Sequence, residues 1–138
     1  AVAHLTDAQW HTPCGDEQRS VGVLAHHVGT MYPIEASVAK QLAETGSLPG
    51  VDWTAVNGIN ADHATTNATP DKSQTIALIR TNVQVAIDTV KAFSDEDLDR
   101  LAPNALAWHA PMTVQIVVES HPIAHPYIHL ESIQSALA

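Results

Sequence analysis

Helical periodicity is the feature that most restricts how this chain folds. Between residues 20 and 45, apolar side chains recur at steps of three and four, a spacing that covers one face of an α-helix. The members of this stripe are Val21, Leu24, Val28, Met31, Ile34, Val38 and Leu42. Ser20 is a suitable N-cap and Gly46 a suitable C-terminal stop, so we expect one long helix here. Pro33 lies inside the segment and removes one backbone donor from it.

Two later segments show the same periodicity, at residues 71–93 and 113–137, and "LTDAQW" indicates the end of a short helix near the start. The stripe of the first of these segments consists of Ile76, Ile79, Val83, Ile87 and Val90. A connection as long as residues 47–70 is usually functional or contains a short helix of its own. We find no convincing strand and no internal repeat. The sequence predicts an all-α antiparallel helical bundle with a short first helix and a long loop between helices two and three.

Length and charge exclude several classes of protein. At 138 residues, the chain forms one domain, residues 1–138, with a substantial core. Six Lys and Arg against fifteen Asp and Glu give a net charge of −9, which argues against nucleic acid and anionic membranes as partners, because both attract basic surfaces. No apolar run approaches the roughly 20 residues that span a bilayer. Cys14 is the single cysteine, so we expect a cytoplasmic protein without an internal disulfide.

The last predicted helix carries histidines where its pattern calls for core residues. Every fourth position from 117 onward stays on one slowly drifting face. The occupants are Val117, His121, His125, His129, Ile133 and Leu137. Its apolar flanks indicate burial, and a buried polar group costs roughly 2 kcal/mol or more if it is left unpaired. The three imidazole rings therefore need partners.

A further histidine lies on the inward stripe of the second helix. This residue is His27, whereas His26 lies about 100° around the helix and is expected to face solvent or a loop. One histidine of this helix can therefore meet an i, i+4 pair of the last helix. Three neutral imidazoles in an apolar cavity form the ligand set of a catalytic metal site with one open position. The alternative is a set of core histidines bonded to carbonyls that Pro122 and Pro126 leave without a donor.

Other polar residues are candidates for supporting roles. His121 stands one turn above His125, so we expect it beside the site rather than on it. In the long loop, Asn60, Asp62 and His63 can supply an acceptor for a ligand ring, a general base or a fourth ligand. A capped short helix at the surface is the simpler interpretation of these three. The histidines expected at the surface or in ordinary packing are His4, His11 and His109.

Several stretches resemble the DinB-like (YfiT-like) metalloenzyme family, and together they cover most of the chain. "LTDAQWHTP" is similar to the end of the family's first helix, and "RSVGVLAHHV" to its second helix, where the spacing from Ser20 places a ligand at His27. "SDEDLDRLA" resembles the segment before the last crossing. "MTVQIVVESHPIAHPYIHLESIQSAL" resembles the final helix, with its H-x-x-x-H-L-x-x-I ending. The resemblance implies a metal triad of His27, His125 and His129.

The resemblance also implies a fold and a chemistry. The fold is an up-down-down-up four-helix bundle that holds one divalent ion per chain, zinc or nickel, often as a homodimer. Relatives include thiol-dependent transferases and isomerases that use bacillithiol or mycothiol. This chain departs from the family in two ways: only ten residues precede "HTP", where the family has a much longer helix, and prolines interrupt the ligand helix. We therefore expect either an incomplete chain or a bundle that is closed differently.

Two functional hypotheses follow. A dication held by three neutral imidazoles favours an anion in its open position, either hydroxide or thiolate. The first hypothesis is therefore a metal-dependent thiol S-transferase, isomerase or hydrolase acting on a small molecule, such as a low-molecular-weight thiol. The second is a non-catalytic metal-binding or dimerising bundle. A purely structural site would be closed by a fourth protein ligand, for which His121 and His63 are the candidates.

Overall fold

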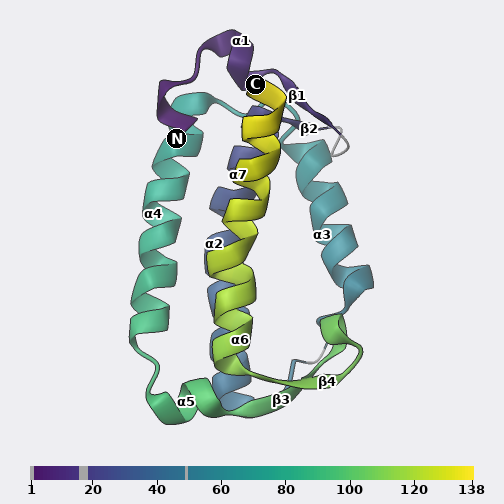
Figure 1. Ribbon diagram of the computed structural model, residues 1–138, viewed down its shortest axis with the longest axis vertical. Helices are drawn as coiled ribbons and strands as arrows, with labels where there is room; N and C mark the ends of the chain where they lie inside the picture. The colour runs from purple at the N-terminus through teal and green to yellow at the C-terminus, as the bar shows by residue number, and fades with distance from the viewer. Residues whose placement is uncertain (1, 16–18, 49) are drawn as a thin grey trace.

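The computed structural model describes residues 2–15, 19–48 and 50–138, which are mainly helical (Figure 1). The longer helices are α2 (Val21–Thr45), α3 (Trp53–Thr66), α4 (Lys72–Lys91) and α7 (Ala124–Leu137). The shorter helical segments are η1 (Val2–His4), α1 (Asp7–Trp10), α5 (Asp95–Asp99), η3 (Ala105–Ala107), α6 (Val114–Val118) and η4 (Glu119–Ile123). The strands are β1 (Pro13–Cys14), β2 (Arg19–Ser20), β3 (Leu101–Asn104) and β4 (Ala110–Thr113).

Helix α2 forms where the periodicity predicts it and ends as its caps predict. The Ser20 side chain accepts a hydrogen bond from the Val23 amide, which satisfies one of the unpaired N–H groups of the first turn. At the other end, Gly46 adopts a left-handed conformation with φ of 68°, and its amide donates to the Leu42 carbonyl. Both boundaries predicted from the sequence are confirmed.

The proline inside α2 is compensated by another helix. Pro33 has no N–H, so it cannot bond to the carbonyl of Gly29 one turn earlier. Asn82 of α4 donates its Nδ2 to that carbonyl at 2.9 Å. Gly29 also allows the two helices to approach closely, because an added Cβ would lie 2.9 Å from Ile79 Cγ1. The contact between α2 and α4 therefore supplies the Gly29 carbonyl with the donor that Pro33 lacks.

Helix α2 is the central element of the fold. Helix α7 lies in front of it in Figure 1, with α4 on one side and α3 on the other, and α2 contacts all three. One buried cluster lies at the C-terminal half of α2 and consists of Ala39, Leu42, Ala43, Ala102, Val114, Val117 and Val118. The other lies at its N-terminal end and consists of Trp10, Cys14, Val21, Leu24, Ala25 and Ile133. The stretch of α2 between these clusters, residues 26–38, is where polar side chains enter the interior.

The last helical segment differs from the single regular helix that the sequence predicts. Thr113 caps α6, and the chain then passes through the π-helical turn η4 into α7. Pro122 lies in η4 and cannot donate to the carbonyl of Val118, which an α-helical turn would require. A π-helical turn holds one extra residue and commonly occurs at functional sites. The change of winding falls directly before His125 and His129.

Strands were not expected, and this expectation is wrong. Strands β1 and β2 form one antiparallel pair, and β3 and β4 form a second, with Leu101 opposite Thr113 and Asn104 opposite Ala110. The second pair lies between α5 and α6, where the sequence predicted no regular element. The long loop expected between helices two and three contains the 14-residue helix α3, which Asp52 caps through the Ala55 amide.

The mainly helical prediction therefore holds, while the up-down-down-up arrangement of four helices is not confirmed. The chain instead combines α2, α4 and the α6–η4–α7 segment with α3 at one side and two short hairpins (Figure 1). Among the described residues, no helix is long and apolar enough to cross a membrane.

Candidate metal centre

Three histidines from two helices converge between the two core clusters. His27 comes from α2, two turns after its N-cap, and His125 and His129 come from successive turns of α7. One ring nitrogen from each histidine lies within 4.8 Å of one from both of the others. His27 is 2% exposed and His129 is 7% exposed, while His125 is half-buried. The structure thus brings together the three residues that the sequence selects.

The rings pack edge to face around a common point. The His27 ring centroid lies 5.2 Å from that of His125 and 5.1 Å from that of His129, and both pairs are T-shaped. The Nε2 atoms of His125 and His129 are 2.8 Å apart, a hydrogen-bonding distance. Two nitrogens that bind one zinc ion tetrahedrally at 2.0–2.1 Å lie about 3.3 Å apart. The two nitrogens therefore need to move apart by only about half an ångström to bind one ion together.

The environment keeps His27 in the form that a metal needs. Burial, together with the neighbouring His129 and His125, lowers the pKa of His27 to about 3, because a charged ring would be poorly solvated and would be repelled by a second positive charge. His27 is therefore neutral at pH 7, and only a neutral imidazole binds a metal ion. Nδ1 of His27 is buried and has no hydrogen-bond partner among the described residues.

Glu35 is a site residue that the sequence analysis missed. It lies two turns beyond His27 on α2, it is 7% exposed, and its Oε1 lies 2.7 Å from Nδ1 of His125. The distance is that of an ion pair, but the ring N–H is not aligned for a hydrogen bond. A carboxylate in this position orients a ligand histidine and makes it a stronger donor to the metal. The sequence did contain a signal for Glu35, namely an acidic residue inside a mainly apolar stretch of the predicted helix.

The other candidates lie outside the convergent group. His121 is half-buried, and its pKa is lowered, because the effect of burial exceeds the opposing effect of the nearby Glu35. Asp62 is exposed on α3. His63 is 7% exposed, and its ring centroid lies 5.2 Å from that of His27. Among the described residues, His27, His125 and His129 form the only group of three or more potential metal ligands that is this compact.

His26 was expected to face solvent or a loop, and it faces the segment predicted as the long loop, residues 47–70, much of which forms α3. His26 is half-buried, and its Nδ1 lies 2.8 Å from Nε2 of His63 on α3. Thr30 Oγ1 lies 3.4 Å from the same nitrogen. Burial lowers the pKa of both His26 and His63. The surface histidines are also found where they were expected: His4, His11 and His109 are exposed.

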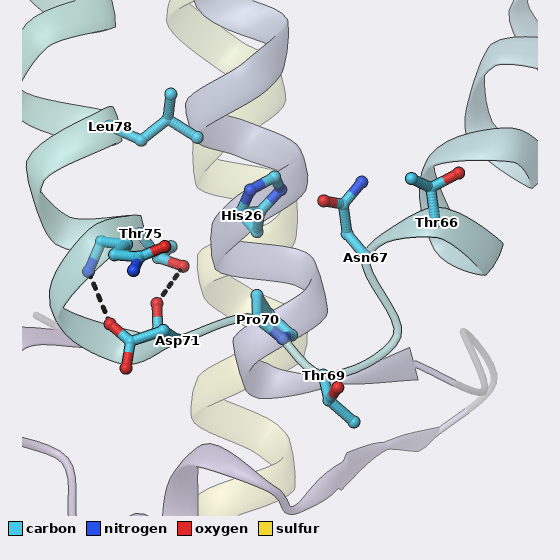
Figure 2. A pocket seen from close by; sticks show the side chains of 9 residues that line it. His26, Thr66, Asn67, Thr69, Pro70, Asp71, Thr75 and Leu78 are labelled. Carbon is cyan, nitrogen blue, oxygen red and sulfur yellow. Dashed lines mark hydrogen bonds between the residues drawn. The ribbon is translucent and has the colours of Figure 1, made fainter.

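Two hollows adjoin the histidines from different sides. A mainly polar cavity of about 470 Å³ lies between α2, the start of α4 and the end of α3, with His26 in its wall (Figure 2). An apolar groove of about 150 Å³ lies against His129, lined by Ala25, Val28, Ile79 and Leu130 among others. The groove is lined in part by His129 of the triad, whereas the described lining of the polar cavity includes His26 but none of the three triad histidines.

Comparison with known proteins gives no independent assignment: none of the protein-family models, curated proteins or solved structures shows a significant match.

Proposed function

We propose that His27, His125 and His129 bind one divalent metal ion, zinc or nickel, in a DinB-like metalloprotein. The observation that carries this proposal is the convergence of three ring nitrogens within 4.8 Å, from two helices, at a largely buried position. Imidazole nitrogen suits zinc and nickel better than it suits magnesium or calcium, which prefer oxygen. A net charge of −9 also favours a cation energetically.

The proposed roles of the residues follow from their contacts. The three histidines hold the ion as neutral ligands, so its positive charge is not cancelled by the protein. Glu35 fixes the orientation of His125 through the 2.7 Å contact to Nδ1. The bound ion would supply Lewis-acid chemistry, which stabilises an anionic thiolate or hydroxide at neutral pH.

We therefore favour an enzyme that transfers a low-molecular-weight thiol or hydrolyses a small molecule. A three-ligand site leaves one position for substrate, whereas structural sites are closed by four protein ligands. Among the described residues, neither His121 nor His63 converges with the triad as a fourth ligand, and this observation supports the catalytic alternative. The apolar groove beside His129 offers space for a small apolar group of a substrate.

The rival proposal is a metal-binding or dimerising bundle without catalytic activity. Its support is an exposed apolar surface on the last helical segment, where Ile116, Ile123, Tyr127 and Ile128 are exposed. An apolar surface of this kind is typical of protein–protein contacts. A homodimer is compatible with either proposal, so the metal site rather than the oligomeric state separates them.

Metal analysis tests the proposal directly. Purified protein should bind one zinc or nickel ion through the triad, and the metal should raise the melting temperature because it binds the folded chain. His27→Ala, His125→Ala and His129→Ala should each abolish this binding. His121→Ala is the matched control on the same helical segment, and it should retain the ion. If all three triad variants bound as many ions per chain as the unmodified protein, the proposal would be refuted.

Coordination number then separates catalyst from scaffold. X-ray absorption at the zinc edge should show three imidazoles and at least one further light-atom ligand that an added thiol replaces. The appearance of a zinc–sulfur distance near 2.3 Å on thiol addition would support the S-transfer function. Four protein ligands and no response to thiol would favour the non-catalytic bundle.

A further inference from the structure

A second pair of histidines, His26 and His63, lies beside His27, with the ring centroid of His63 5.2 Å from that of His27. His26 of α2 and His63 of α3 place Nδ1 and Nε2 2.8 Å apart, although 37 residues separate them in sequence. Their ring planes are tilted by 35°, with centroids 5.1 Å apart. The nitrogen–nitrogen distance equals that between His125 and His129 in the triad. The fold therefore builds two close imidazole pairs, and His27 lies against both.

A hydrogen bond alone leaves this second pair unsatisfied. Whichever ring donates, Nδ1 of His63 stays buried without a partner among the described residues. Oδ1 of Asn60 is a buried acceptor that also lacks a partner there. A buried polar group in this condition costs about 1–3 kcal/mol. The hydrogen-bonded state thus leaves two unpaired atoms on one face of α3.

A cation bound between the two rings would fix the tautomer of His63, so that its Nδ1 is a donor and Oδ1 of Asn60 a matching acceptor. Binding through Nε2 of His63 places the proton of that ring on Nδ1, which becomes a donor. Asn60 stands three residues earlier on α3, at a spacing that puts its side chain beside that of His63. Its free Oδ1 is the type of acceptor that a metal-binding histidine uses to fix its tautomer.

The packing of α3 also points to a function for His63. Among the 14 residues of α3, His63 is the buried one, while Ile59 is exposed and Val56 is half-buried. A helix normally attaches to a domain through an apolar stripe. Here the most buried side chain is an ionisable ring that faces another ring on α2.

The polar cavity reaches the pair at His26, which lies in its wall. Figure 2 shows the His26 ring in the cavity wall, with Asn67 beside it and Asp71 and Thr75 farther along the same cavity. The cavity volume of about 470 Å³ admits several water molecules and a hydrated ion. Water that enters this cavity can complete a coordination sphere that two protein nitrogens begin.

We propose that His26 and His63 bind a second divalent transition-metal ion, of the imidazole-preferring class that includes zinc, nickel and copper, next to the triad. Two protein ligands make this site weaker than the three-histidine site. Asn60 positions His63 by accepting a hydrogen bond from its Nδ1–H group. The second ion is reached from the polar cavity, independently of the groove beside His129.

Zinc titration of the metal-free full chain tests this assignment. Isothermal titration calorimetry, with equilibrium dialysis to measure bound zinc, should give two ions per chain in the unmodified protein. His26→Ala and His63→Ala should each reduce the number to one, and His125→Ala should remove the other ion. The His26→Ala/His125→Ala double variant should bind none. His4→Ala removes an exposed histidine as the matched control and should keep two.

The positioning role of Asn60 has its own readout. Asn60→Ala should keep both ions but weaken the second one by about 10- to 100-fold, with the first affinity unchanged. Because His63 is the buried anchor of α3, its variant is checked by circular dichroism, and the half-buried His26 gives an answer even if His63→Ala unfolds.

The possible failures point to different sites. One ion that is lost in His125→Ala and retained in His26→Ala would overturn the second site and leave the proposed function intact. One ion that is lost in His26→Ala and retained in His125→Ala would uphold the second site and overturn the triad. Two ions retained in His26→Ala would also overturn the second site.

Discussion

Replacing Glu35 by Gln isolates the contribution of the carboxylate that contacts the triad. Glu35 is 7% exposed, and its Oε1 lies 2.7 Å from Nδ1 of His125, so its charge acts on the ring with little screening by water. Gln has the same shape and keeps one acceptor oxygen, but it lacks the charge. Residues that support a ligand in this way typically change metal affinity by 10- to 100-fold.

The retained acceptor places Glu35→Gln at the lower end of that range. We expect zinc affinity to fall about tenfold, which corresponds to about 1.4 kcal/mol. Glu35→Ala also removes the acceptor, so its loss should approach 100-fold, or about 2.7 kcal/mol. The assay is calorimetric zinc titration in competition with a chelator at pH 7.5, with melting curves of the metal-free proteins as the measure of folding.

Glu44 provides the matched control for this experiment. It lies on the same helix, but it is exposed and its contact is a 3.8 Å ion pair with Lys40. Glu44→Gln should leave the zinc affinity unchanged, since exposed ion pairs contribute little. If Glu35→Gln bound zinc within twofold of the unmodified protein, the carboxylate would have no role in the site. A loss as complete as that of His125→Ala would make Glu35 a ligand itself.

The remaining predictions concern stability. His27 has a folded pKa of about 3 against 6.5 in the unfolded chain, so below pH 6.5 the unfolded chain binds a proton that the folded chain does not. As the pH falls from 6.5 to 3, the metal-free protein should therefore lose up to about 1.4 kcal/mol of unfolding free energy per pH unit. Urea unfolding of His27→Gln at several pH values should show a weaker dependence of this free energy on pH. An unchanged dependence would contradict the lowered pKa of His27. Gly29→Ala should destabilise by about 1–3 kcal/mol, because the new Cβ would lie 2.9 Å from Ile79 Cγ1, whereas Gly58→Ala, with open space around it, should stabilise by about 0.4–1 kcal/mol. Asn82→Ala should cost about 1–2 kcal/mol by leaving the Gly29 carbonyl without its donor, and a change below about 0.3 kcal/mol in thermal or urea unfolding would show that water replaces the side chain.

Local signals in the sequence were sufficient for the main helices. The boundaries of α2 were predicted from Ser20 and Gly46, because a cap acts on the backbone of its own turn and needs no distant partner. The inward positions of three histidines were also predicted, since a helix with a period of 3.6 residues assigns its positions to faces. His27, His125 and His129 fell on such faces, and the structure brings them together.

Hydrophobic periodicity did not predict the contacts between distant segments. The periodicity of residues 72–91 includes Ile87 in its stripe, yet this side chain is 39% exposed, because periodicity identifies an apolar face without naming the element that covers it. The two hairpins were missed for a similar reason. Strands as short as Pro13–Cys14 and Leu101–Asn104 have too few residues to show alternation, and their pairing depends on the partner strand.

The sequence by itself determined the main helices and the inward positions of His27, His125 and His129, because both properties depend on neighbours within one turn. Only the tertiary structure decided which of those rings meet. Packing of α7 on α2 puts Glu35 beside His125, and packing of α3 on α2 makes His63 the partner of His26. The angle at which two helices cross is set by the side chains of both, so no single helix carries this information.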